Sequence, residues 1–137
     1  MAEESINGIV VFCTDPRTKN ANLWKHIKNH LIPPDQRLAP VGLFGAPVAL
    51  ARPADFPIKF AAVMEDIGFA LKKFAKGRFV VVGHDCGIYT ELTRSKVTLG
   101  DKMNDIAIAA DFLRGRFPGM PVSAFFKKST SGFEEIR

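Results

Sequence analysis

Two short apolar runs, rich in β-branched residues, constrain the fold of this chain more than any other feature. Residues 8–13 are Gly-Ile-Val-Val-Phe-Cys, and residues 78–83 are Arg-Phe-Val-Val-Val-Gly. Continuous apolar runs of this length are typical of strands in a parallel sheet, because both faces of such a sheet are covered. Polar residues follow each run at once. The sequence therefore predicts two buried parallel strands, each ending in residues that can carry chemistry.

Segments with helical periodicity separate the predicted strands. Apolar residues recur every three or four positions in three segments: Leu23, Trp24, Ile27 and Leu31; Phe60, Val63, Met64, Ile67 and Leu71; and Met103, Ile106, Ala107, Ala110 and Leu113. Gly77 is expected to end the second helix, and a further helical segment is expected to start near residues 87–89. Weaker strands are expected over residues 38–43, followed by a loop, and over residues 121–128. Strands alternating with helices predict an α/β fold, a central, mostly parallel sheet of about four to five strands flanked by helices, within a single domain spanning 1–137.

The composition is that of an ordinary globular protein. The 137 residues are 47% hydrophobic and 24% charged, with a formal net charge of +5. The basic residues are scattered, which favours a solvated surface over a nucleic-acid-binding patch. The N-terminus is acidic, and no stretch approaches the roughly 20 apolar residues of a membrane helix. With only two cysteines, the sequence predicts a cytoplasmic, reduced protein with no membrane contact and no disulfide framework.

Residues with reactive or metal-binding side chains gather at the ends of the two strongest strands. Cys13, Asp15 and Arg17 end or follow the first, and His84 and Cys86 follow the other. In open parallel sheets, ligands bind beyond the carboxyl ends of the strands. Thiolate and imidazole are ligands that Zn²⁺ prefers, and a catalytic zinc keeps one position for water. The sequence therefore predicts Zn²⁺ held by Cys13, His84 and Cys86, with Asp15 and Arg17 as the catalytic pair.

Several alternatives remain open for these residues. Asp15 can occupy the fourth zinc position, or it can pair with Arg17 and accept a hydrogen bond from the zinc-bound water. A buried cysteine can be no more than a small apolar side chain. Without metal, the two thiols can act as a redox or regulatory pair. His26 and His30, four positions apart on the first helix, are a weaker candidate for a second metal site.

At these residues the sequence resembles the β-class carbonic anhydrases. Residues 12–17 (Phe-Cys-Thr-Asp-Pro-Arg) are similar to that family's Cys-x-Asp-x-Arg motif. Residues 80–87 (Val-Val-Val-Gly-His-Asp-Cys-Gly) are similar to its apolar strand followed by Gly-His-x-x-Cys-Gly. Residues 122–126 and 129–132 resemble its final strand and hairpin. The resemblance implies a β-carbonic-anhydrase-like fold, the zinc ligands named above, an Asp15–Arg17 dyad, and a homodimer or larger homo-oligomer.

The activity implied by this resemblance is that of a zinc lyase, with zinc-bound hydroxide attacking CO₂ or a related small electrophile to give bicarbonate or its equivalent. The sequence departs from the family pattern in two places. Only Asp85 separates His84 from Cys86, where the family has two residues, and residues 43–47 (Leu-Phe-Gly-Ala-Pro) stand where the family has Asn-Ala-Gly. These departures keep a second function open: a carbonic-anhydrase-like protein that binds metal or ligand without hydrating CO₂.

Overall fold

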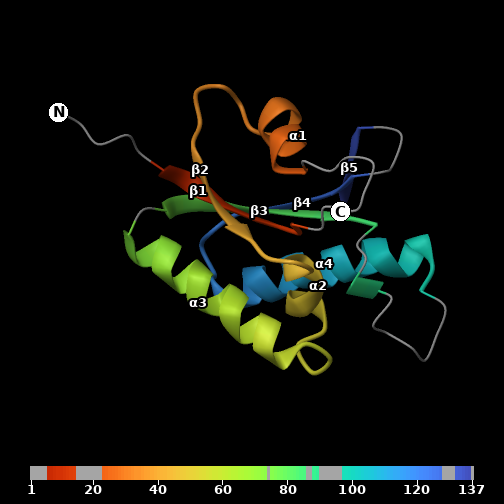
Figure 1. Cartoon of the computed structure of the whole chain (residues 1–137). Coiled ribbons are helices and arrows are strands. Elements are labelled where there is room, and N and C mark those ends of the chain that lie inside the picture. The colour runs from red at the N-terminus through yellow and green to blue at the C-terminus, as the bar shows by residue number, and fades with distance from the viewer. Residues whose placement is uncertain are drawn as a thin grey trace.

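The computed structural model describes residues 6–14, 23–73, 75–85, 88–89, 97–127 and 132–136 (Figure 1). The chain alternates strands and helices, as the periodicity predicts. Its elements are β1 (Ile6–Phe12), α1 (Leu23–His30), β2 (Leu38–Gly42), α2 (Ala46–Ala51), α3 (Pro57–Lys73), β3 (Ala75–His84), α4 (Leu99–Arg116), β4 (Val122–Lys127) and β5 (Phe133–Ile136).

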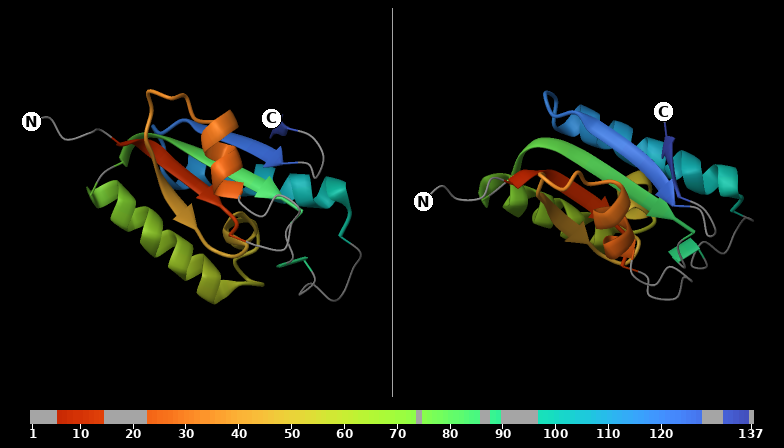
Figure 2. Two further views of the ribbon diagram at one scale, coloured as in Figure 1. Left: turned by 45° about the horizontal axis from the view of Figure 1, so that its top comes forward. Right: turned by 90° about the horizontal axis from the view of Figure 1, so that it is seen from above.

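These strands form one sheet in the order β2-β1-β3-β4-β5. The first four are parallel, and β5 pairs antiparallel with β4. The arrowheads of β1 (red), β3 (green) and β4 (blue) point toward the same edge in Figure 2. The predicted α/β class, with a mostly parallel sheet flanked by helices, is confirmed.

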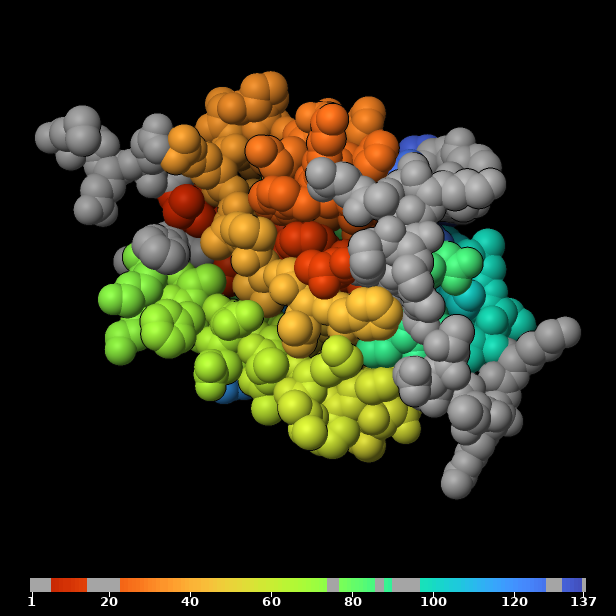
Figure 3. Space-filling view, viewed as in Figure 1, coloured from red at the N-terminus to blue at the C-terminus, as the bar shows by residue number. Residues whose placement is uncertain are grey.

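Helices cover both faces of the sheet. In Figure 1, α1 lies above it, and α2, α3 and α4 lie below it. In the space-filling view of Figure 3, α1 (orange) and α3 (yellow-green) occupy the upper and lower parts of the visible face. No helix within the described part of the chain is long and apolar enough to cross a membrane.

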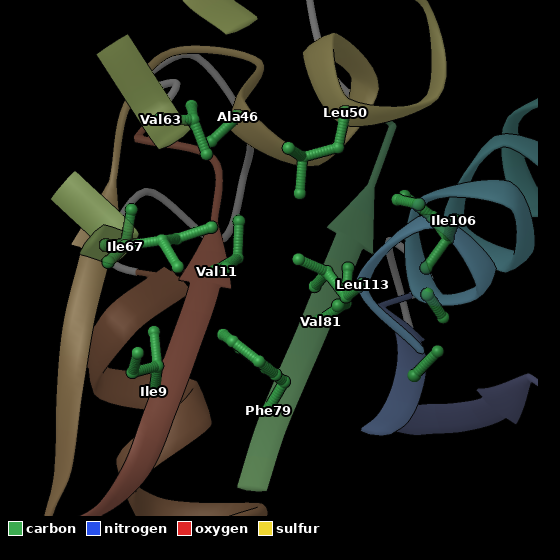
Figure 4. Packing of buried hydrophobic residues seen from close by; sticks show 14 of the residues in the cluster. Ile9, Val11, Ala46, Leu50, Val63, Ile67, Phe79, Val81, Ile106 and Leu113 are labelled. Atoms are coloured by element: carbon green, nitrogen blue, oxygen red, sulfur yellow. The ribbon is translucent and has the colours of Figure 1, made fainter. Parts of the chain in front are cut away.

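Alternating residues of the central strands fill two separate cores, because successive side chains point to opposite faces of a sheet. Ile9 and Val11 of β1 pack with Phe79 and Val81 of β3 against α2, α3 and α4, as Figure 4 shows. The intervening residues pack against α1 instead, in a cluster of Val10, Phe12, Leu23, Ile27, Leu38, Val80 and Val82. The β-branched runs are therefore buried on both faces, as expected of central parallel strands.

Two elements differ from the sequence-based expectations. Gly77 does not end a helix: α3 ends at Lys73, and Gly77 lies inside β3, where φ is +157° and a Cβ atom would overlap the carbonyl oxygen of Asn7. The glycine accommodates the register shift between β1 and β3. The second difference is α2, which forms where a loop was expected. Pro47 lies in its first turn, a position that proline tolerates because the N–H it lacks has no intrahelical partner.

The described C-terminal elements agree with the sequence more closely. The strand predicted over residues 121–128 is β4, but it is not the last strand, because β5 follows it. Helix α4 covers the predicted helix and begins two residues before the expected start at Asp101, so its first turn includes Leu99 and Gly100. That turn is stabilised by a capping box in which Asp101 N–H donates to Thr98 Oγ1 and Thr98 N–H donates to Asp101 Oδ2. Of the helical segment that the sequence suggested after residue 87, the structure describes only a 3₁₀ turn at Ile88 and Tyr89.

Candidate functional site

Two of the five predicted site residues lie at one edge of the sheet. Cys13 directly follows β1, and His84 is the last residue of β3. These strands are neighbours and parallel, with Phe12 opposite Val82. Cys13 and His84 therefore come from adjacent strand ends, as the sequence predicts. Asp15, Arg17 and Cys86 lie outside the described residues, so their roles stay predictions.

Cys13 is enclosed by apolar side chains. It is 2% exposed and packs with Val48, Ile88 and Tyr89. Its Sγ atom accepts a hydrogen bond from the backbone N–H of Gly45, at 3.1 Å. This hydrogen bond holds the sulfur in one position within its apolar surroundings.

Gly45 can make this contact because of its backbone conformation. It precedes α2 with φ +74° and ψ +19°, the left-handed region that glycine adopts readily. A Cβ atom at this position would overlap Cδ1 of Ile88. Glycine is thus favoured at this position for two reasons, the left-handed backbone conformation and the close approach of Ile88. In this conformation the Gly45 N–H points at the Cys13 sulfur.

His84 has a buried ring nitrogen that makes no hydrogen bond within the described part of the chain. The residue is 6% exposed, and its Nε2 atom finds no partner among the described residues. A buried polar atom without a partner costs about 1–3 kcal/mol, and so its presence calls for an explanation. A metal ion at Nε2 would supply one, because neutral imidazole is a common zinc ligand.

The sheet register directs Cys13 and His84 to opposite faces. His84 continues the row of Val80 and Val82, which faces α1, whereas Cys13 continues the row of Val11, which faces the other three helices. A metal ion bound by both residues would have to lie beyond the strand ends, between the two rows.

A buried ionic cluster borders this edge, and the sequence analysis missed it. Asp105 of α4 is 3% exposed. Its Oδ2 atom accepts hydrogen bonds from Tyr89 Oη and from Arg52 Nε, both at 2.9 Å. The bond to Asp105 is the main cause that raises the pKa of the Arg52 guanidinium above its usual value. The signal in the sequence is positional: Asp105 shares the helical stripe of Ala109 and Leu113, and a carboxylate on a buried stripe must have a partner.

A second ion pair lies next to this cluster. Lys102 Nζ, from the first turns of α4, donates to Asp85 Oδ1. The same ammonium lies 5.3 Å from the ring centroid of Tyr89, within the range of a cation–π contact. Asp85 is the single residue between the predicted ligands His84 and Cys86.

His26 and His30, the weaker metal candidates, stack on α1 with ring centroids 6.1 Å apart, and His30 also contacts Phe133. Within the described ranges, no three His, Cys, Asp or Glu side chains lie close enough together to hold a metal ion. The predicted zinc set includes a residue outside those ranges, so it stays a prediction. Comparisons with known protein families, with curated proteins and with solved structures found no match for this chain.

Proposed function

We propose that this chain is a zinc-dependent lyase of the β-carbonic-anhydrase type, acting on CO₂ or a related small electrophile. The observation that carries the proposal is the buried Nε2 atom of His84, unpartnered among the described residues, at the end of the strand adjacent and parallel to the one that the buried Cys13 follows. Ligand sites of parallel sheets lie at this edge. The β-carbonic-anhydrase-like fold is part of the same proposal, supported by the resemblance of the two motifs that begin at these strand ends.

The described donors fit a zinc ion. An imidazole nitrogen that lacks a hydrogen bond among the described residues can accept a metal, and a cysteine sulfur can bind one as the thiolate. Cys86 would be the third ligand. When bound, zinc lowers the pKa of a coordinated water to about 7 and so supplies hydroxide at neutral pH.

The chain's own residues would position the reactants. The N–H of Gly45 orients the Cys13 sulfur. Val48 and Ile88, with the partly buried Phe44, pack around Cys13, and such apolar surroundings would suit an uncharged substrate such as CO₂. Arg17 would keep Asp15 ionised, and the Asp15 carboxylate would accept a hydrogen bond from the attacking water.

Zinc content and CO₂ hydration test this proposal together. We expect about one zinc ion per chain in zinc-replete protein, and hydration above the buffer rate. Cys13→Ser and His84→Ala are each expected to lose most of the zinc and all measurable hydration. His30→Ala is the matched control, because it removes an imidazole from an exposed position of α1. Wild-type protein that stays metal-free after purification and incubation with excess zinc would refute the proposal.

A second candidate function is metal or ligand binding without CO₂ hydration. The opposite faces of Cys13 and His84, together with the single residue between His84 and Cys86, favour it, because both strain a three-ligand site. Full zinc occupancy with hydration at the buffer rate, at neutral and mildly alkaline pH, would select this candidate. Rapid hydration would exclude it.

The resemblance also leads us to propose a homodimer or larger homo-oligomer. Sedimentation equilibrium at several protein concentrations measures the assembled mass. A monomer at all of them would contradict this part of the proposal and leave the zinc chemistry standing.

A further inference from the structure

The outer side of α3 leaves two large apolar side chains in solvent. The helix buries Val63, Ile67 and Ala70 in the core. On the opposite side, Ile58 is 84% exposed and Phe69 is 61% exposed. In Figure 1, α3 runs along the lower side of the molecule, and no described element covers its outer side. Single exposed apolar side chains are normal on a surface, but these two lie three turns apart on one helix and so share a face.

The residues between them complete a stripe of the kind that packs against another helix. The stripe follows alternating steps of four and three positions and consists of Ile58, Ala62, Glu65, Phe69 and Lys72. Such spacing keeps side chains on the seam between two paired helices. Ala62 is small enough to let a second helix approach closely. Glu65 can lay its methylene groups on the seam while its carboxylate stays in water.

Charged side chains follow one flank of this stripe. Lys59, Asp66 and Lys73 are each seven positions apart, which places them on one side of the helix next to the seam. Helix α3 has no residue of opposite charge three or four positions from Asp66 or Lys73. Within the described part of the chain, no salt bridge involves these two residues, and Lys59 lies 5.5 Å from the ring centroid of Phe44. The flank therefore presents charges that its own helix does not neutralise.

This charge pattern is complementary to itself when two copies of α3 run antiparallel. In an antiparallel pair, a flank of one helix lies beside the same flank of the other. If Ile58 lies opposite Phe69 of a second copy, Lys59 lies within one turn of Asp66 of that copy. The apolar contact and the ion pair thus require the same register.

The ends of the helix favour the same direction. This register also places Lys72 opposite Asp55 of the second copy, and the Asp55 side chain is 52% exposed. In a parallel pair, by contrast, Glu65 would face Glu65 and Lys72 would face Lys72. Like charges at such positions are destabilising, so the charges select the antiparallel arrangement.

We propose that α3 pairs with α3 of a second copy of this chain, antiparallel and related by a twofold axis that passes beside Ala62 and Glu65. A twofold contact uses the same surface on both copies, so each contact occurs twice. This pairing would supply the contact surface of the homo-oligomer in the proposed function, and it rests on that part of the proposal and not on zinc. One helix pair is small beside the roughly 1,200–2,000 Å² of a stable interface, so the dimer is expected to dissociate at micromolar concentrations.

Truncating the apolar contact is the first test. Sedimentation equilibrium over a series of protein concentrations measures the dimer affinity. Phe69→Ala should weaken it by at least about 100-fold, because the twofold contact loses two phenylalanine rings. Ile108→Ala is the matched control, because it truncates another exposed apolar side chain, on α4, and it should leave the affinity unchanged. Both side chains are exposed, so the variants should fold, and circular dichroism checks this.

Reversing the flank charges tests the antiparallel register. Lys59→Glu and Asp66→Lys each place like charges at both symmetric contacts and should weaken the dimer by about tenfold or more. The double variant, which keeps the net charge of the wild type, should restore the wild-type affinity. An equimolar mixture of the two single variants should associate more tightly than either alone, because every flank contact in the mixed dimer pairs opposite charges.

The outcomes separate this pairing from the rest of the proposed function. Metal-free wild-type protein that dimerises and responds in these ways would sink the zinc proposal and leave the α3 pairing standing. A dimer whose affinity is unchanged in Phe69→Ala would overturn the pairing and leave the homo-oligomer to another surface. A double variant as weak as the single ones would overturn the antiparallel register. A wild type that is monomeric at every concentration would overturn both the pairing and the homo-oligomer, and the face would then belong to a different partner.

Discussion

Replacing Gly45 with alanine tests the turn that connects β2, α2 and Cys13. Gly45 has φ +74°, and its N–H donates to Cys13 Sγ. An alanine Cβ would overlap Cδ1 of Ile88, which is 1% exposed and packed beside Cys13. Two separate penalties are therefore expected from one added methyl group.

The expected loss of stability follows from these two terms. A non-glycine residue in the left-handed region costs about 1–2 kcal/mol. Forcing a methyl group into a filled core costs about 1–3 kcal/mol. Gly45→Ala should therefore destabilise the protein by about 2–5 kcal/mol, a large share of the roughly 5–15 kcal/mol typical of a domain.

Two other glycines separate these terms. Gly119 has φ +100°, and a Cβ atom there would meet no described atom, so Gly119→Ala should show the backbone term alone. Gly68 lies inside α3 with open space around it, so Gly68→Ala should stabilise by about 0.5–1 kcal/mol. Urea denaturation at equilibrium measures all three changes. A Gly45→Ala loss within about 0.5 kcal/mol of the Gly119→Ala loss would refute the clash with Ile88.

Two further predictions concern α4. Thr98→Ala should cost about 1 kcal/mol by removing the helix cap. Hydrogen bonds from the Thr98 backbone and side chain lower the pKa of Asp101 in the folded protein below its usual value of 3.8. The ionised Asp101 therefore stabilises the folded protein fully above pH 3.8, and this stabilisation is lost as the pH falls through the lower folded-state pKa. The difference in urea midpoint between wild type and Thr98→Ala should therefore shrink as the pH falls through this range. A difference that stays constant would contradict the link between Thr98 and the ionisation of Asp101. Leu113→Ala should cost about 2–5 kcal/mol, because Leu113 is fully buried between α4 and the sheet; a loss below about 1 kcal/mol would show that the core collapses around the cavity.

The local sequence pattern predicted the elements whose residues repeat regularly. Residues 9–12 of β1 and 79–82 of β3 are apolar at every position because parallel central strands are buried on both faces. The inner faces of α1 and α4 follow from helical spacing, and Leu23, Ile27, Ile106 and Leu113 are buried as expected. The sequence also predicted that Cys13 and His84 lie at the carboxyl edge of the sheet. This prediction requires only the positions of the strand ends and the parallel direction of the strands.

Elements set by contacts between distant residues could not be predicted in this way. Helix α2 has six residues and begins at a glycine and a proline, so its own pattern is too short to identify it. Gly77 resembles a helix stop, and only the register of β3 against β1 shows that it lies inside a strand.

The sequence by itself determined the sheet class, the strand ends and the kinds of side chain available there, because these depend on residue type and short-range periodicity. Only the tertiary structure decided which groups those side chains meet. Gly45 reaches Cys13 from 32 positions away, and Asp105 binds an arginine 53 positions before it. The register of β1 against β3 places the Cys13 and His84 side chains on opposite faces of the sheet. His84 Nε2 is buried and has no hydrogen-bond partner among the described residues. Hydrogen bonds and burial depend on the packing of whole elements, and a pattern of nearest neighbours does not contain that packing.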